Sequence, residues 1–322
     1  MVLRRVLQAF ALGLALNIAV ADAQPYPSQT IRIVVPFPAG GINDVVARLI
    51  APLLQEALGQ SVIVDNRPGA SGILGTNAVA TAPNDGHTLL MVASSHSVAP
   101  ASGTKLPYDT ESDFAAIALV SRNPLLLVVN RNTPAATLPE FIALAKAAPG
   151  YFNYATVGNA SQSHLVTILL EQRAGIKMQH IPYRGGAPAI TSLMTGETQF
   201  SVLSPQVSLP QIEAGTIRPI AVGGLTRDPQ FPAVATIAEA GFPGFEATQW
   251  VGLLAPAGTS REIVGRLNAE INLVIKNPEI VAKFAQLGMT PAGGTPEQFQ
   301  KTIVNEIKLW SDIAHSAHVN DP

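Results

Sequence analysis

The sequence predicts an α/β protein of two lobes, one of them inserted into the other. Short apolar runs typical of strands alternate with longer segments of helical periodicity, a pattern that favours βαβ units and mostly parallel sheets. Two apolar, β-rich runs flank Asn123 and Pro124, where the chain is suited to pass from one lobe to the other. We therefore expect lobe 1 over residues 24–122 and 224–322, lobe 2 over 123–223, and a hinged cleft between them, with each boundary uncertain by about eight residues.

The first lobe is expected to begin with strands over 31–36, 61–64 and 88–93. Helical periodicity over 44–58 and 73–81 places a helix after each of the first two strands. The sequence from Asn66 to Gly69 contains a proline and a glycine and ends the second strand in a turn. Two further strands, over 117–120 and 125–130, lead into the second lobe.

The second lobe repeats the alternation of strand and helix. Its strands are predicted over 152–156, 178–182, 199–203 and 217–222, and its helices over 138–147, 163–174, 188–195 and 205–214. A strand over 250–255 and helices over 260–276, 278–287 and 296–317 complete the chain. Thr295, Pro296 and Gln298 give the last helix a strong start, with a capping threonine, a proline at the first helical position and a glutamine at the third.

The composition excludes several classes of protein. The 322 residues include 26 Gly, 26 Pro and no Cys, so disulfides, zinc–cysteine sites, thiol nucleophiles and lipid-modified cysteines are impossible. Charged residues make up 13%, against about 25% in an average soluble chain. With 20 Lys and Arg against 22 Asp and Glu and no basic run, the chain does not resemble a nucleic-acid-binding protein. The 47% hydrophobic content argues against disorder.

Residues 1–23 have the pattern of a secretory signal peptide. Arg4 and Arg5 precede an apolar run that ends at Val20, and alanines at 21 and 23 form an A-x-A cleavage pattern. The apolar run is shorter than the ~20 residues needed to cross a bilayer, which argues against a membrane anchor. We expect cleavage after Ala23 and a periplasmic protein.

Candidate ligand-binding residues lie in five turns that follow strands. Ligands of open α/β sheets bind beyond the carboxyl ends of the strands, and the free N–H groups of a helix N-terminus attract anions. Ordinary helix capping is the alternative interpretation for each turn taken singly. The candidates are Phe37, Pro38, Ala39, Gly40, Gly41, Asn43, Asp44, Ser94, Ser95, Asn159, Ala160, Ser161, His164, Tyr183, Arg184, Gly185, Gly186, Ala187 and Ser204.

Patterns for catalysis are weak. Gly40 and Gly41 do not complete a dinucleotide-binding motif, there is no phosphate-binding Walker loop, and the six histidines have no metal-ligand spacing, so we predict no cofactor and no metal. A hydrolase triad could be assembled from Ser95, His164 and Asp44, but no nucleophile elbow supports it. Arg184 is the one cation within a candidate turn, where it could clamp a carboxylate or point to solvent.

The mature chain resembles the Bug (TctC-type) extracytoplasmic solute receptors of tripartite tricarboxylate transporters. The resemblance extends from Tyr26 to the last helix and is carried by ordered motifs. These motifs are IVVPFPAGG at 33–41 with Asp44, VDNRPGA at 64–70, NDGHTLL at 84–90, LPYD at 106–109, NYA at 153–155, GN at 158–159 with HL at 164–165, IPYRG at 181–185, FPGFE at 242–246 and LAPAGT at 254–259.

This resemblance implies a two-lobed periplasmic binding protein, a type II-like Venus flytrap with two crossings between lobes and no catalytic activity. It implies that turns 37–44 and 183–187, with donors from 159–163, hold a small carboxylate, in particular a dicarboxylate. It also implies a monomer that delivers the solute to TctA/TctB-like permease subunits. A ligand-sensing accessory protein of a membrane kinase and a secreted Ser/His hydrolase are the alternative functions.

Two positions depart from the family pattern. Many members have a polar pair where this chain has Leu203 and Ser204, which disfavours an amino-acid ligand because an ammonium group would lose a partner. The sequence from Ser94 to Ser97 replaces a turn richer in glycine, and this change is expected to alter the size and polarity of the pocket.

Overall fold

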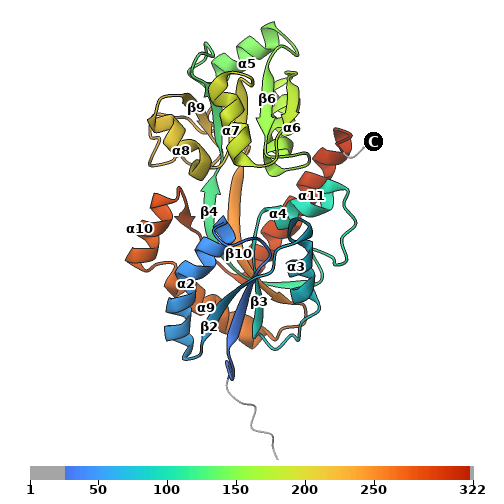
Figure 1. Cartoon of the computed structure of the whole chain (residues 1–322), viewed down its shortest axis with the longest axis vertical. Helices are drawn as coiled ribbons and strands as arrows, with labels where there is room; N and C mark the ends of the chain where they lie inside the picture. The colour runs from blue at the N-terminus through green and yellow to red at the C-terminus, as the bar shows by residue number, and fades with distance from the viewer. Residues whose placement is uncertain (1–25, 320–322) are drawn as a thin grey trace, which may run out of the picture.

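The computed structural model describes residues 26–319, so the predicted signal peptide lies outside the described residues. Two β-sheets lie at opposite ends of an elongated molecule, each flanked by helices, and extended strands join them (Figure 1). The α/β fold of two lobes predicted from the sequence is confirmed. Within residues 26–319 no helix is both long enough and apolar enough to cross a membrane.

The larger sheet has six strands in the order β11-β4-β10-β3-β1-β2. Its strands are β1 (Ile31–Val35), β2 (Val62–Asn66), β3 (Thr88–Ala93), β4 (Phe114–Pro124), β10 (Thr248–Pro256) and β11 (Thr290–Pro291). The helices of this part are α2 (Ile42–Leu58), α3 (Ile73–Ala80), α4 (Ser95–Val98), α9 (Arg261–Val274), α10 (Pro278–Gln286) and α11 (Pro296–Ser316), with short 3-10 turns over Ala70–Gly72 and Ala99–Ser102. The buried face of α2 follows helical spacing through Val46, Ile50 and Leu54 and packs on the sheet.

The smaller sheet has five strands in the order β7-β6-β8-β5-β9. These strands are β5 (Leu126–Asn130), β6 (Asn153–Thr156), β7 (Gln179–Pro182), β8 (Phe200–Leu203) and β9 (Ile217–Val222). Helices α5 (Leu138–Ala147), α6 (Gln162–Ala174), α7 (Gly186–Thr195) and α8 (Pro205–Glu213) cover it. The stacked rings of Phe141 and Phe200, 4.9 Å apart, lie in the core between α5 and the sheet.

The prediction of mostly parallel sheets is wrong. Strands β1, β2 and β3 pair in parallel, as do β6, β7 and β8, but β10 runs antiparallel to β3 and β4, and β5 runs antiparallel to β8 and β9. The reason is that β4, β5 and β10 carry the chain between the sheets. A strand that arrives from the other lobe enters its sheet at the edge where the parallel strands end, so it runs antiparallel to them. Sequence periodicity also missed the two 3-10 turns, the short elements α4 and β11, and the full length of β4.

Three backbone hydrogen bonds hold the crossing strands together between the two sheets. Leu125 N–H donates to Ala247 O (2.9 Å), Ala247 N–H to Gly223 O (2.8 Å), and Gly223 N–H to Leu125 O (2.7 Å). A Cβ atom on Gly223 would lie 2.2 Å from Ala247 O, so only glycine allows this approach. We call these three residues the hinge, as the predicted point of rotation between the lobes.

The packing around the hinge indicates the residue at which the chain leaves lobe 2 and returns to lobe 1. Residues after the predicted boundary at 223, among them Ile237, Phe245 and Ala247, pack with the core of the smaller sheet. Helix α11 contributes Phe299 and Ile303 to a core of the larger sheet, and Trp310 and Ile313 to that of the smaller one. The packing favours a return to lobe 1 at about Thr248, with α11 shared between lobes.

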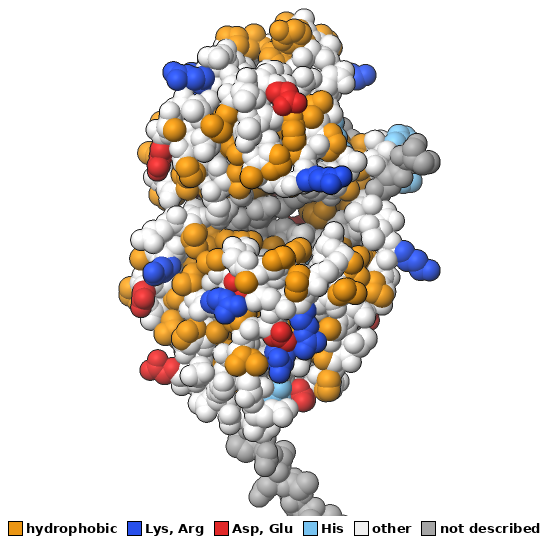
Figure 2. Space-filling model, viewed as in Figure 1, with side chains coloured by type: hydrophobic (Ala, Val, Ile, Leu, Met, Phe, Trp, Pro, Cys, Tyr) orange, Lys and Arg blue, Asp and Glu red, His pale blue; other side chains and the backbone are white. Residues whose placement is uncertain are grey.

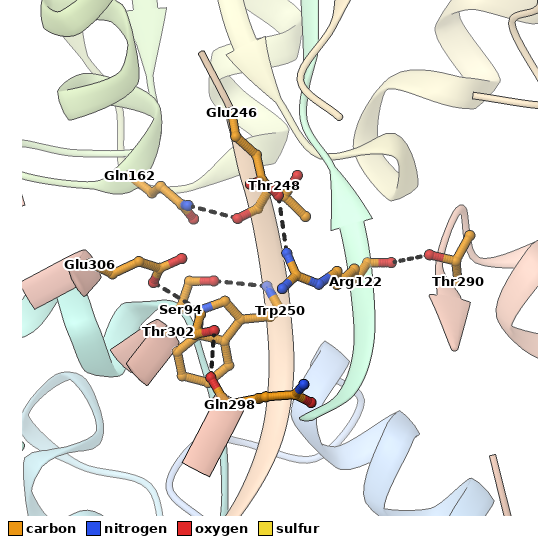
Figure 3. A network of polar contacts seen from close by, with 10 residues as sticks. All are labelled: Ser94, Arg122, Gln162, Glu246, Thr248, Trp250, Thr290, Gln298, Thr302 and Glu306. Atoms are coloured by element: carbon orange, nitrogen blue, oxygen red, sulfur yellow. Dashed lines mark hydrogen bonds and ion pairs between the residues drawn. The ribbon is translucent and has the colours of Figure 1, made fainter. Parts of the chain in front are cut away.

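A buried polar network links α11 to the returning strand β10 (Figure 3). The Trp250 indole N–H donates to Glu306 Oε2 (2.8 Å), while Trp250 N–H donates to Ser94 Oγ (2.8 Å). On the neighbouring strand Arg122 pairs with Glu246 at 3.0 Å. Burial raises the pKa of Glu306 to about 7, although the hydrogen bond from Trp250 opposes the rise.

We predict that Glu306→Gln makes stability less dependent on pH. The carboxyl pKa is higher in the folded protein than in the unfolded chain, so the free energy of unfolding falls as pH rises from about 4.5 to about 7. Glutamine keeps an acceptor for Trp250 and removes this titration. Thermal melts from pH 4 to pH 8 should show the variant gaining several degrees on the wild type towards pH 8. Parallel melting curves at all pH values would contradict the prediction.

Candidate functional site

The strand registers bring the carboxyl ends of both sheets to the space between the lobes. β10 starts at the hinge with Thr248. β3 is antiparallel to β10 and ends at Ala93, opposite Val251. β1 is parallel to β3, so it ends at the same edge of the sheet. In the smaller sheet β8 ends at Leu203 opposite Leu126, where β5 leaves the hinge, and β6 and β7 run parallel to β8. The turns that follow these strands therefore face the other lobe, as ligand turns of open sheets do.

The turn 37–44 ends in a helix whose N-terminus has no side-chain cap. Gly41 is the N-cap residue of α2 in an extended conformation, and no side chain accepts a hydrogen bond from the first turn. Gly40 has a φ of +87°, which favours glycine. The unsatisfied N–H groups and the dipole of this 17-residue helix form a site for an anion.

Asp44 supports this turn from behind instead of facing the cleft. Its carboxylate accepts hydrogen bonds from Gly40 N–H, Arg48 Nε and Asn66 Nδ2, each 2.9 Å long. Burial alone would raise the pKa of Asp44, but these bonds and the charge of Arg48 outweigh it and hold the pKa below its usual value. Asn66 also donates to Phe37 O (3.2 Å), so both ends of the turn are fixed.

Two cavities adjoin the turn in the cleft, which is visible as a hollow between the two halves of the surface (Figure 2). The smaller, about 480 Å³, lies at the start of α2 beside the hinge; the larger, about 880 Å³, extends sideways to α4 and the turn of lobe 2 after β6. Phe37, Ser95 and Gln249 line both. The smaller cavity is also lined by Pro38, Ala39, Gly41, Asn43, Ser94, Asn123 and Trp250, and the larger by residues 70–73, Thr76, Tyr108, Asn159, Ala160, Ser161 and Gln162.

Three of the four helices of lobe 2, α6, α7 and α8, follow strands of the cleft edge and differ in their capping. Ser161 caps α6 by accepting from His164 N–H (3.4 Å), which matches the ordinary capping interpretation of that turn. α7 and α8 begin at Gly185 and Ser204 without a side-chain cap, which leaves N–H groups for a ligand at Gly186 and Ala187 of α7. At α8 the free donor is Gln206 N–H, because Pro205 has no N–H and Val207 N–H donates to Ser204 O (3.2 Å). None of residues 183–187, nor Ser204, lines the two cavities described above. The larger cavity is nevertheless lined from both lobes, by Phe37 and Tyr108 of lobe 1 and by Asn159 and Ser161 of lobe 2.

His164 lies within lobe 2 as part of a ring stack. Its Nδ1 accepts a hydrogen bond from Ala160 N–H (3.2 Å), and its ring stacks on His180 with centroids 3.8 Å apart. Burial lowers the pKa of His164 to about 4, an effect to which His180 adds. A neutral His164 thus supports the left-handed conformation of Ala160 (φ +50°) in the turn.

The predicted residues fall into three groups. The first group lines the cavities and comprises Phe37, Pro38, Ala39, Gly41, Asn43, Ser94, Ser95 and residues 159–161. Gly40, Asp44 and His164 shape the turns, and residues 183–187 and Ser204 line neither cavity. Sequence reasoning missed the turn 70–73, Thr76, Tyr108, Gln162 and Gln249. The consecutive positive φ angles of Ala70, Ser71 and Gly72 mark that turn, but only the glycine is visible as a signal in the sequence.

The hydrolase triad is not supported. Asp44 is occupied by its own turn and Arg48, and His164 uses Nδ1 to accept from Ala160. Among residues 26–319 there is also no group of three or more His, Cys, Asp or Glu side chains that could hold a metal ion.

Comparisons with known proteins agree on one family. Residues 46–318 match the model of the tripartite tricarboxylate transporter family receptor. The chain is 38% identical to protein BugT of Bordetella pertussis over 92% of this chain and 91% of that protein. Its structure is similar to that of R. palustris Rpa4515 with adipate (34% identity, TM-score 0.77, 91% and 98% of the two chains). A ligand-free TctC solute binding protein from Polaromonas gives a TM-score of 0.81 at 30% identity, over 90% and 99% of the chains.

We predict that Asp44→Asn weakens ligand binding by about tenfold or more, because the pair with Arg48 loses its charge and the amide NH2 cannot accept the hydrogen bond from Gly40 N–H, so the turn 37–41 loosens. The melting temperature should fall as well, by an amount equivalent to about 1–3 kcal/mol. Asp312→Asn is the matched control: it also removes an (i, i+4) ion pair, with Lys308, but on an exposed surface. Equal affinities of the two variants would refute a supporting role for Asp44.

Proposed function

The chain belongs to the tripartite tricarboxylate transporter receptor family of periplasmic solute-binding receptors, and on this premise we propose that it captures a small carboxylate, in particular a dicarboxylate, between its lobes. The observation that carries the proposal is the set of uncapped helix starts: α2 on lobe 1, and α7 and α8 on lobe 2, all at strand ends that face the cleft. Helix N-termini on both lobes suit a ligand with a negative group at each end.

The binding energy would come from backbone dipoles and hydrogen bonds more than from ionised side chains. One helix terminus contributes about 0.3–2 kcal/mol to anion binding, so several termini must act together to reach micromolar affinity. They act together when the lobes bring these turns onto one ligand, since turn 183–187 and Ser204 do not line the cavities beside α2 in this structure. A ligand that completes its contacts only in the closed form shifts the protein towards closure.

Arg184 supplies the charge in this arrangement. It is exposed in the turn between β7 and α7, next to the uncapped start of that helix. A guanidinium group binds a carboxylate through two parallel hydrogen bonds, which fixes the orientation of the ligand as well as adding affinity. The adipate in the Rpa4515 structure is a dicarboxylate and supports this ligand class.

Delivery to TctA/TctB-like permease subunits by a monomeric receptor is the transport role that follows. Family membership supports it, and so does export through the predicted signal peptide with cleavage after Ala23. A closed receptor presents the two lobes in a fixed relation, which is the state a permease can distinguish from the empty protein.

We predict that C4 to C8 dicarboxylates raise the melting temperature of the protein while the corresponding uncharged diamides do not. A ligand at 100 times its Kd stabilises the folded state by about 2.7 kcal/mol, which a thermal-shift assay detects easily. Absence of stabilisation by every carboxylate tested, aromatic ones included, would overturn the proposal.

We further predict that Arg184→Met weakens dicarboxylate binding about 10- to 100-fold in calorimetry, the value of a lost charge-assisted hydrogen bond. Arg173→Met is the control, because Arg173 is also an exposed arginine of lobe 2 but lies in the last turn of α6. If both variants bind like the wild type, Arg184 has no part in recognition.

A further inference from the structure

The lobes also touch away from the hinge, between the start of α8 in lobe 2 and the end of α10 in lobe 1. Gln206 Nε2 donates to Leu287 O at 2.6 Å, and Gln230 Nε2 donates to Ala285 O at 2.9 Å. Gly288, with a φ of +65°, lies against Pro205 so closely that a Cβ there would be 2.4 Å from Pro205 Cβ. In Figure 1, α8 lies directly above α10 on the same side of the molecule. We call this contact, formed by Pro205, Gln206, Gln230, Ala285, Leu287 and Gly288, the clasp.

The chemistry of the clasp is that of helix capping across two lobes. The last carbonyl groups of a helix have no partner within it. Here the side-chain amide of Gln206 binds the carbonyl of Leu287, just beyond the end of α10, and that of Gln230 binds Ala285 O in addition to Gly288 N–H (3.0 Å). Phe284 and Ile280 anchor α10 in the core of the larger sheet, so the clasp ties that core to lobe 2.

The clasp is formed in an arrangement in which the start of α8 lies away from the two cavities. Pro205 directly follows Ser204, the residue at the start of α8, which lines neither cavity. When lobe 2 rotates to bring this turn onto the ligand, Pro205 and Gln206 move relative to Gly288 and Leu287. Contacts this close do not survive such a movement unchanged, because packed interfaces switch between arrangements instead of stretching.

We propose that the clasp is a latch that holds the receptor open until a ligand is bound. A ligand must then supply the free energy to break it, which lowers the apparent affinity but keeps the empty receptor from closing. The effect on affinity rests on the proposed function, whereas the effect on the empty protein does not.

The first test compares Gln206→Ala with the wild type in adipate binding. Losing one net hydrogen bond of the open state should tighten binding about two- to tenfold, and Gln206→Ala with Gln230→Ala should tighten it further. Gln300→Ala is the matched control, since Gln300 Nε2 donates to Glu111 O at 3.3 Å within lobe 1. Unchanged or weaker binding by the Gln206 variants would overturn the latch.

A substitution at Gly288 gives the second test. The Cβ of Gly288→Ala would lie 2.4 Å from Pro205 Cβ, so Pro205 must move away and the clasp is broken. This variant should bind adipate about two- to tenfold more tightly than the wild type. Gly175→Ala is the matched control, because Gly175 also has a left-handed φ, +63°, but a Cβ there meets no atom within 4 Å. Equal affinities of the two variants would count against the latch.

The third measurement needs no ligand. Small-angle scattering of the empty protein should give a smaller radius of gyration for the double variant Gln206→Ala, Gln230→Ala than for the wild type or Gln300→Ala, because closing the lobes makes the molecule more compact. Identical radii would count against the latch. If the wild type binds no carboxylate, the proposed function fails, and this measurement still decides the latch.

Discussion

The arrangement of this protein depends on the closed set of backbone hydrogen bonds among Leu125, Gly223 and Ala247. Each of the three residues donates to one of the others and accepts from the remaining one, so the crossing strands are joined at one level between the sheets. A short joint of this kind permits rotation of one lobe against the other with little loss of hydrogen bonding. It also sets the registers of β4, β5 and β10, and through them the edges at which the neighbouring strands end.

The proposed site uses few charges, in keeping with the low charge of the chain as a whole. In our proposal an anion at the start of α2 meets N–H groups fixed by a carboxylate behind them, since Asp44 binds Gly40, Arg48 and Asn66 at once. A negative side chain thus shapes a site for a negative ligand without facing it, because its own charge is balanced by Arg48. His164 has the same kind of role in lobe 2, where a neutral ring holds the Ala160 backbone in place. The dipoles are positioned in advance, which reduces the cost of ordering them when a ligand binds.

Much of the fold could be predicted from the sequence because its signals are local. The apolar spacing of α2, the cap at Thr295 and the short strand runs all reflect contacts within a few residues, and each led to an element close to the observed one. The turns after β1, β3 and β6 were identified from glycine and polar residues for the same reason. The antiparallel strands were missed because strand direction depends on partners distant in sequence. Gln162 and Gln249 were missed because an isolated glutamine gives no local signal, although both line the larger cavity.

The sequence by itself determined the α/β class, the two lobes, the turns rich in hydrogen-bond donors and, through ordered motifs such as those at 33–41 and 181–185, the receptor family. Only the tertiary structure decided which predicted residues line a cavity and which support it from behind, as it did for Asp44 and His164. It also revealed the joint at Gly223 and the contact between Pro205 and Gly288, in which residues far apart in the chain come within van der Waals range. The physical reason is that helix and strand preferences act over a few residues. The direction of a carboxylate, an imidazole or an amide is instead fixed by partners that only the folded chain brings near.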